Sequence, residues 1–187
     1  SQVDTQGCSW YNEFKVKFCE ETEMGERPEL SKELNIELIR ATVGDAAQLW
    51  EMQVKSFQAL LDKYQDYETS PASEPLEKMI HRLNQKETFY YFIVVDHVKV
   101  GAIRVIDEQT GERKRISPIF ILPEYQNRGI AQKAMKLCED IHGCEKWELD
   151  TILQEEGNCY LYEKMGYHRT GKSEVINDKL TLVFYEK

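Results

Sequence analysis

Long apolar runs are missing from this sequence: no segment approaches the roughly 18 consecutive apolar residues that a transmembrane helix needs. The N-terminus also lacks the basic-then-apolar pattern of a secretory signal. Internal repeats and low-complexity tracts are absent as well. These absences favour a cytoplasmic protein without membrane contact, and a length of 187 residues makes one folded domain the default expectation.

Positive charge is scarce relative to negative charge. The chain has 24 Lys and Arg residues against 33 Asp and Glu residues, which gives a net charge of -9. This balance argues against non-specific binding to nucleic acid or to an anionic membrane surface. An acidic surface suits a cationic small molecule better, although acidity can also serve solubility alone.

Cysteine and histidine are too scattered to predict a disulfide framework or a metal site. The cysteines are odd in number, widely spaced and without a C-x-x-C pair, and the histidines have no second pair of ligands nearby. Cys138 is expected in the core, and Cys159 in the core or the lining of a pocket. The cysteines are Cys8, Cys19, Cys138, Cys144 and Cys159.

Residues 1–34 differ in composition from the rest of the chain. They are polar, rich in Glu and contain an aromatic cluster. Three roles are open for this extension: an extra strand on a sheet edge, an arm used for dimerisation, or a domain-specific segment. A homodimer is therefore one of the states that the sequence allows, and residues 35–187 are expected to form the folded domain.

From residue 35 the hydrophobic pattern becomes regular. A short strand at Ile36–Ile39 precedes an amphipathic helix, which Asp45 is expected to cap. The polar loop Asp66–Glu74 leads into a second helix and has the length of loops that cover pockets. Two β-rich runs, Thr88–Asp96 and Val98–Ile106, predict an antiparallel hairpin, and a third strand follows it.

The most informative segment is the junction between that third strand and a helix. The strand Ile116–Leu122 ends at Pro123, and the residues 126–131 lead into the helix. The first turn of a helix has unpaired N–H groups and the positive end of the dipole, which together suit a diphosphate. Gly129 lets the backbone approach a ligand closely, and Arg128 adds a positive charge. The apolar face of this helix is expected to comprise Ile130, Ala134, Leu137, Cys138 and Ile141.

The C-terminal part continues with alternating elements. Trp147–Thr151 is a strand that must run parallel to the one before the helix, because a helix connects them. A helix over Asn158–Met165, closed by Gly166, then precedes two strands at Tyr167–Thr170 and Leu180–Tyr185.

Two motifs resemble signatures of the GNAT superfamily of acyl-CoA-dependent N-acyltransferases. Gln126–Ala131 is similar to the Q/R-x-x-G-x-G/A motif, and Leu161–Tyr167 is similar to a Tyr-Glu-Lys run that ends in Gly and an aromatic residue. The resemblance covers residues 35–187. It implies an α/β (α+β) fold, with a mixed, mostly antiparallel central sheet of about six to seven strands that contains a splayed parallel strand pair and is flanked by about four helices.

The resemblance also implies acetyl-CoA as the acyl donor and no metal. The pantetheine would lie on the backbone of Ile119, Phe120 and Ile121, as an added strand does. Family members often place an asparagine after the second splayed strand; Glu155 occupies that site here, and the nearby Asn158 either caps the helix or contacts the cofactor. The pyrophosphate would bind the N–H groups of Gln126, Asn127, Arg128, Gly129, Ile130 and Ala131.

Tyr162 is the residue to which the resemblance gives a chemical role, at the donor's thioester. A phenol with a pKa of roughly 10 can protonate a departing thiolate with a pKa of roughly 8–9. The amine acceptor in turn needs a base, for which Asp150 is the leading candidate, and Glu148 lies on the same strand face. Either carboxylate could instead bind a cationic substrate. Residues 114–117 of the other splayed strand offer no carboxylate.

The predicted function is transfer of an acetyl group from acetyl-CoA to a primary amine of a small molecule or peptide. Attack would be direct, in a ternary complex, because no cysteine has the neighbours of a nucleophile. Two alternatives stay open. One is transfer of a longer acyl group, which the pocket near Phe120 and Tyr160 would decide, and the other is a non-catalytic acyl-CoA sensor or interaction module.

Overall fold

The computed structural model describes residues 34–187. The aromatic cluster and the proposed dimerisation arm of the N-terminal extension therefore lie outside the described residues. None of the helices between residues 34 and 187 combines the length and the apolar content that crossing a membrane requires.

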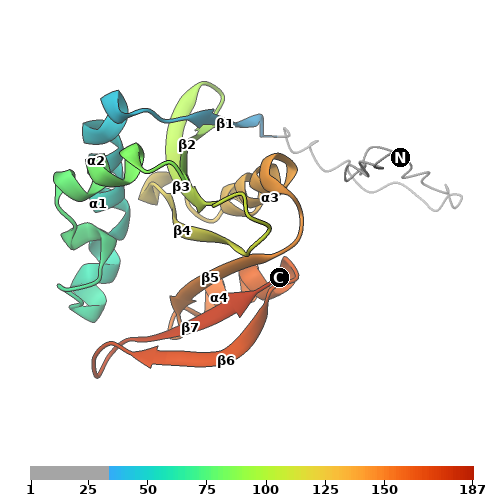
Figure 1. Cartoon of the computed structure of the whole chain (residues 1–187). Coiled ribbons are helices and arrows are strands. Elements are labelled where there is room, and N and C mark those ends of the chain that lie inside the picture. The colour runs from blue at the N-terminus through green and yellow to red at the C-terminus, as the bar shows by residue number, and fades with distance from the viewer. Residues whose placement is uncertain (1–33) are drawn as a thin grey trace, which may run out of the picture. The chain divides into compact units, whose positions relative to one another are not determined.

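The described residues form a seven-stranded sheet with the strand order β1-β2-β3-β4-β5-β7-β6 (Figure 1). Neighbouring strands are antiparallel except β4 and β5, which are parallel because a helix crosses over between them. This confirms the predicted mixed sheet with one parallel pair. The strands are β1 (Ile36–Arg40), β2 (Thr88–Val95), β3 (Val98–Ile106), β4 (Lys114–Ile121), β5 (Trp147–Ile152), β6 (His168–Val175) and β7 (Thr181–Glu186).

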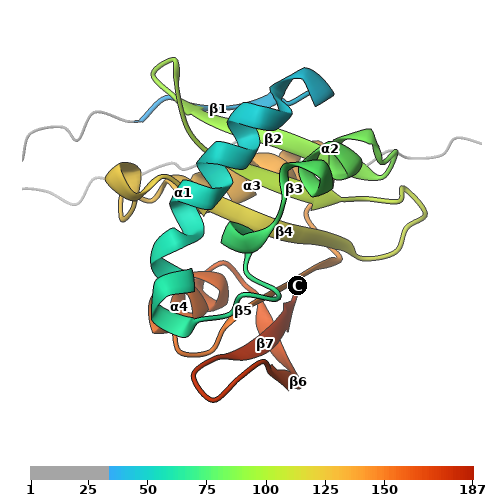
Figure 2. The ribbon, with the colours of Figure 1, turned by 90° about the vertical axis from the view of Figure 1, so that its left-hand side faces the viewer.

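Four α-helices accompany the sheet in this part of the chain. The helices are α1 (Ala46–Tyr64), α2 (Leu76–Asn84), α3 (Ile130–His142) and α4 (Glu156–Lys164). Figure 1 shows α1 and α2 on one face of the sheet and α3 on the opposite face. In Figure 2, α1 runs across the sheet from β1 to the neighbourhood of α4. The main core fills the space between the sheet and the first two helices, around Leu49 and Met52 of α1, Met79 of α2 and Phe92 of β2.

Some local predictions were wrong. Asp45 precedes α1, but its carboxylate accepts hydrogen bonds from the Thr42 backbone N–H at 2.8 Å and from the Thr42 hydroxyl, and it makes none to the helix amides. The predicted apolar face of α3 included Ile141 and left out Met135. In the structure Met135 is buried and Ile141 is exposed. The helix α4 begins at Glu156, two residues before the predicted start. The errors concern the ends of helices and the limits of a helix's apolar face, where short-range patterns specify the structure least.

Strands β3 and β4 come very close at Gly101. A Cβ atom placed on Gly101 would lie 2.2 Å from the carbonyl oxygen of Phe120 and 3.1 Å from the Cα of Ile121. These are backbone atoms, so no rotation of a side chain could relieve the contact. Glycine at this position therefore allows β4 to pair tightly with β3.

Replacing Gly101 with alanine should destabilise the fold, because the added Cβ would push β4 away from β3. We expect Gly101→Ala to cost about 2–4 kcal/mol and to lower the melting temperature by roughly 5–10 °C. Gly157→Ala is the matched control, since nothing lies within 4 Å of that position and it is helical. Thermal unfolding followed by circular dichroism would measure both, and an unchanged melting temperature for Gly101→Ala would contradict the argument.

Candidate functional site

Strands β4 and β5 are paired only where they begin. The parallel register joins Lys114 to Trp147 and Arg115 to Glu148, and it goes no further within the described sheet. On its other side, β5 stays paired with β7 as far as Ile152. The two parallel strands therefore diverge after their first residues, which confirms the predicted splayed pair.

The edge of β4 that faces this gap offers backbone hydrogen-bonding groups. The Leu122 N–H donates to the Val100 carbonyl on the β3 side, at 2.8 Å. Because successive residues in a strand direct their backbone groups to opposite edges, those of Ile119 and Ile121 face the gap. The Ile121 carbonyl already accepts a hydrogen bond from the Gln126 side-chain amide at 2.9 Å. An extended ligand in the gap could still pair with the remaining groups as a strand does.

The turn between β4 and α3 has the backbone of an anion site. Asn127 and Gly129 both have left-handed conformations, with φ of 61° and 75°. The Lys133 N–H donates to the Gly129 carbonyl at 3.3 Å. The N–H groups of Ile130 and Ala131 come before this first turn of hydrogen bonds, so they have no acceptor inside the helix. They lie at the positive end of the helix dipole, an arrangement that suits an anion.

A cavity of about 570 Å³, which we call the α3 cavity, opens beside this turn. It runs from the first turn of α3 along residues 119–121 of β4 to α4. Phe120 is buried in its wall and Tyr160 is exposed at its rim. Arg128 does not line it, because its guanidinium is directed to the Glu124 carbonyl, at 3.2 Å.

A second cavity of about 440 Å³, which we call the α2 cavity, lies between α2, the loop of residues 66–74 and the diverging strands. The loop lines this cavity, as its length suggested. The α2 and α3 cavities adjoin, because several residues line both of them. The shared residues are Phe57, Leu60, Ile119, Asn158 and Tyr162.

Tyr162 of α4 stands at this junction. Its side chain is only 7% exposed, and its hydroxyl has no hydrogen-bond partner among residues 34–187. Burial, with a smaller contribution from the charge of Asp150, raises the pKa of Tyr162 to about 12. The phenol is therefore a weaker acid than the free side chain, and it stays protonated at every physiological pH.

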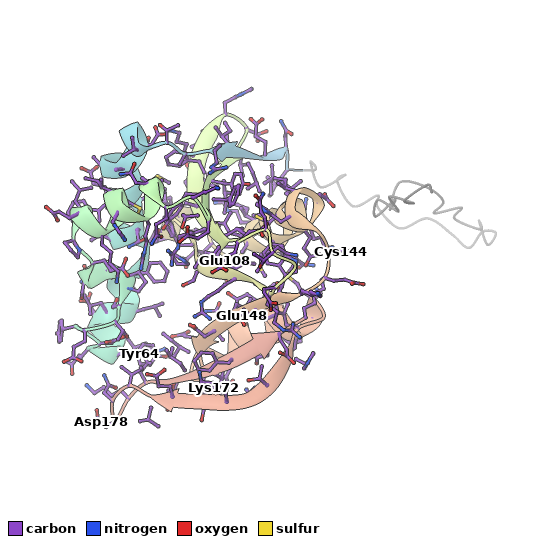
Figure 3. The ribbon with its side chains drawn as sticks, in the orientation of Figure 1. Tyr64, Glu108, Cys144, Glu148, Lys172 and Asp178 are labelled. Atoms are coloured by element: carbon purple, nitrogen blue, oxygen red, sulfur yellow. The ribbon has the colours of Figure 1, made fainter. Side chains whose placement is uncertain are left out.

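The two predicted carboxylates of β5 lie on one face of the sheet, as expected from their spacing. Both face Arg115 of β4: Asp150 forms an ion pair and hydrogen bond with it, and Glu148 is 3.8 Å away. Figure 3 shows Glu148 on β5 and Tyr64 at the C-terminal end of α1. Only Asp150 lines the α2 cavity, whereas Glu148 is outside its lining and 43% exposed.

Asn158 does not cap α4, which corrects one of the two predicted roles. The helix begins two residues earlier, and Glu155 holds the N-cap position without capping through its side chain. The Glu155 carboxylate instead binds the end of α1: the Tyr64 hydroxyl donates to it at 2.7 Å, and Lys63 lies 2.9 Å away. Asn158 is left to line both cavities beside Tyr162.

Sequence reasoning missed a polar network at the far end of the α2 cavity. Glu74 accepts hydrogen bonds from both terminal nitrogens of Arg82, at 2.7 and 2.9 Å, and from the Gln53 amide at 3.0 Å. Lys78 lies 3.0 Å from the same carboxylate. Gln53 is fully buried and also accepts from the Tyr90 hydroxyl. Only the i,i+4 spacing of Glu74 and Lys78 was a usable sequence signal.

A family profile described as "Acetyltransferase (GNAT) domain" matches residues 43–187. The chain belongs to the GNAT acetyltransferases. Membership confirms the resemblance of the two motifs, and it makes the protein an acetyltransferase whose acyl donor is acetyl-CoA. No group of three or more Asp, Glu, His or Cys side chains in the described part of this GNAT domain is placed to hold a metal ion.

Solved structures of acetyltransferases share the fold of this GNAT domain at low sequence identity. The ribosomal-protein-S18-alanine N-acetyltransferase from Escherichia coli is 9% identical, with a TM-score of 0.63 over 81% of this chain and 92% of that chain. The spermidine N-acetyltransferase from Vibrio cholerae, in complex with CoA and spermine, is 16% identical, with a TM-score of 0.62 over 80% and 93%.

The microcin C7 self-immunity acetyltransferase MccE, in complex with acetyl-CoA and AMP, is 15% identical, with a TM-score of 0.62 over 81% of this chain and 91% of that chain. A search of curated proteins finds no match to this chain. Since the names of these three acetyltransferases differ while their fold is shared, the likeness shows the fold of the GNAT domain and leaves its acceptor open.

The Glu74 network should stabilise the domain in a pH-dependent way. Burial alone would raise the pKa of the Glu74 carboxyl, but Lys78, Arg82 and the Gln53 amide outweigh it and lower the pKa below the usual 4.5. A carboxyl whose pKa is lowered by folding stabilises the fold fully above its unfolded-state pKa, and this contribution disappears as the pH falls through the folded-state pKa.

We therefore expect Glu74→Gln to lose about 1–3 kcal/mol of unfolding free energy at pH 7, and the difference from wild type to shrink below a pH of about 4.5. Glu68→Gln, an exposed position in the same loop with the same change of charge, is the control. Urea unfolding at several pH values would measure both. A loss that is equal at pH 7 and pH 3.5 would contradict the role of the ionised carboxylate.

Proposed function

We propose that the protein transfers the acetyl group of acetyl-CoA to a primary amine, by direct attack within a ternary complex. The observation that supports this most is the meeting of the α2 and α3 cavities at Tyr162. A transfer reaction needs two binding spaces that share one point, where the reacting atoms come together. The α3 cavity would hold the donor and the α2 cavity the acceptor.

The donor would bind with its pantetheine in the gap between β4 and β5, along the backbone of Ile119 and Ile121. The walls there are apolar, with Phe120 buried beside them. Its pyrophosphate would lie on the N–H groups between Gln126 and Ala131, at the start of α3. Asn158, which lines both cavities, would contact the donor near the thioester.

The acceptor amine would attack from the α2 cavity. An alkylammonium group has a pKa of about 10, so at pH 7 the reactive free amine is roughly one molecule in a thousand. Asp150 lines this cavity and its carboxylate lies beside Arg115, so it would accept the proton directly or through water. Glu148 lies further from the cavity and would have a supporting electrostatic role.

Tyr162 would act on the other side of the carbonyl. As the amine nitrogen bonds to the carbonyl carbon and the C–S bond breaks, negative charge develops on the sulfur. Full proton transfer from a phenol of pKa about 12 to a thiolate of pKa roughly 8–9 would cost about 4–5 kcal/mol. The hydrogen bond from the Tyr162 hydroxyl to the sulfur is therefore its main contribution, and the thiol can take its proton from the amine by way of Asp150 or water.

A negative charge at the start of α3 should weaken donor binding, because it would face the pyrophosphate. We expect Ala131→Glu to raise the Kd for CoA at least tenfold, measured by isothermal titration calorimetry. Lys136→Gln lowers the net charge by the same amount from an exposed position on the same helix, and it should leave the Kd within about twofold. Equal affinities for the two variants would exclude the pyrophosphate from this turn.

Removing the Tyr162 hydroxyl should reduce turnover while leaving donor binding intact. We expect Tyr162→Phe to lower kcat by about 10²–10³-fold, with a nearly unchanged Kd for acetyl-CoA. Tyr67→Phe, an exposed tyrosine outside the lining of both cavities, is the control. Release of CoA thiol over a panel of amines provides the assay. The donor assignment fails if acetyl-CoA gives no thermal stabilisation, and the Tyr162 role fails if kcat is unchanged.

A further inference from the structure

Arg115 is the last residue of β4 that pairs with β5, and it lies where the two strands begin to diverge. In the register it faces Glu148, and beyond this pair the two described strands are no longer joined. Asp150 follows two residues later, so its side chain projects from the same face of β5 as that of Glu148. The Arg115 side chain crosses the start of the gap and donates a hydrogen bond to the Asp150 carboxylate.

The Asp150 carboxylate has few restraints besides this contact. Within residues 34–187, Arg115 is the one side chain that hydrogen-bonds to it, through the oxygen Oδ2. The backbone of Asp150 is paired with Phe184 of β7, on the side away from the gap. A carboxylate without a partner rotates about its side-chain bonds, and fixing it costs entropy. The oxygen Oδ1 accepts no hydrogen bond from a side chain in this part of the chain, and Asp150 lines the α2 cavity.

Arg115 itself lies behind the cavity wall. Its side chain is 30% exposed, and it is outside the lining of both the α2 and the α3 cavity. Its ion-pair partners are the two carboxylates of β5, Asp150 and Glu148. An effect of Arg115 on a ligand in the α2 cavity would therefore pass chiefly through Asp150.

Glu148 gives the guanidinium a second counter-ion. It lies 3.8 Å from one terminal nitrogen of Arg115, while the other terminal nitrogen binds Asp150. A cation makes a neighbouring carboxylate a weaker base, and a second carboxylate on the same cation offsets this effect. Because the trio has one cation and two carboxylates, a proton taken up by Asp150 would leave Arg115 paired with Glu148. A planar guanidinium suits this arrangement, since its nitrogens point in different directions.

We propose that Arg115 is a positioning residue for acetyl transfer: it holds the Asp150 carboxylate toward the acceptor nitrogen, and Glu148 balances its charge when Asp150 takes up the proton. The proposal rests on the proposed function. In the step concerned, the nitrogen–carbon bond forms and the carbon–sulfur bond breaks. The acceptor nitrogen gives its proton to Oδ1 of Asp150, and that proton then passes to the CoA sulfur. Arg115 touches none of the reacting atoms.

Steady-state kinetics test this, with acetyl-CoA and the amine acetylated fastest among benzylamine, 1,4-diaminobutane, glycinamide and lysine methyl ester. We expect Arg115→Met to lower kcat about 10- to 100-fold and to leave the KM for acetyl-CoA nearly unchanged. Arg115→Lys should recover part of the loss, because it keeps the charge without the planar fork.

Arg113→Met is the matched control for these variants. It removes another arginine ion pair that links the start of β4 to β7, with Glu186 at 3.5 Å, and Arg113 is outside the lining of both cavities. Its kcat should stay within about twofold of wild type, because a partly exposed ion pair contributes little.

A double-mutant cycle separates positioning from a structural effect. Asp150→Asn should lower kcat about 100-fold or more. Adding Arg115→Met should then change kcat by less than about twofold, because no base is left to position. An arginine with a merely structural role would lower kcat in both backgrounds.

The outcomes separate the proposal from the function on which it rests. If Arg115→Met retains kcat, lowers it equally in the Asp150→Asn background or matches Arg113→Met, or if Asp150→Asn itself retains kcat, the proposal is overturned and acetyl transfer stands. If acetyl-CoA binds and no amine of the panel is acetylated, the proposed function fails and the proposal fails with it. Where Arg115→Met does not fold, Arg115→Lys decides the matter: it must lower kcat in the wild-type background and leave it unchanged in Asp150→Asn.

Discussion

The divergence of β4 from β5 is the constraint on which the rest of this molecule depends. Two residue pairs hold the strands together at one end, and further along the backbone edge of β4 is open to a ligand. A continuous sheet would satisfy those groups internally and leave no room for a substrate. The cost of opening the sheet is limited because β4 remains paired with β3 and β5 remains paired with β7. Each half of the sheet therefore keeps its own strand pairing, and the gap between them is the candidate site.

Two halves that are joined so briefly need other connections, and α1 provides one of them. Its C-terminal end reaches α4 through Tyr64 and Lys63, which both bind Glu155. The carbonyl of Tyr64 also accepts a hydrogen bond from Asn177, in the connection between β6 and β7, at 3.0 Å. Figure 2 shows how α1 spans the sheet to reach this second half. These contacts fix the distance between the cavity walls, so the position of Tyr162 relative to β4 depends on α1.

The sequence was a good guide wherever a short segment specifies its own structure. The turn at Gly129, the hairpin of β2 and β3, and the α4 motif around Tyr162 are local features, so their spacing predicted them. The parallel direction of β5 followed from chain topology alone. Helix ends were less predictable, because Asp45 and Glu155 each had a competing partner that only the folded chain brings near. The GNAT family match then confirmed the family that the two motifs had indicated.

The polar lining of the α2 cavity was not predictable, and the reason lies in long-range contacts between charges. Glu74 meets Arg82 and the buried Gln53, while Asp150 meets Arg115 across the splayed strands. None of these pairs has a spacing that marks it in the sequence. Only the neighbouring pair of Glu74 and Lys78 does, because the two residues are four apart. The net charge of the whole chain describes the exposed surface, where most charges are solvated and screened. Inside a cavity the pairing of each charge with its neighbours decides which ligand is favourable. The overall acidity of the protein is therefore a poor guide to which acceptor its cavities would favour.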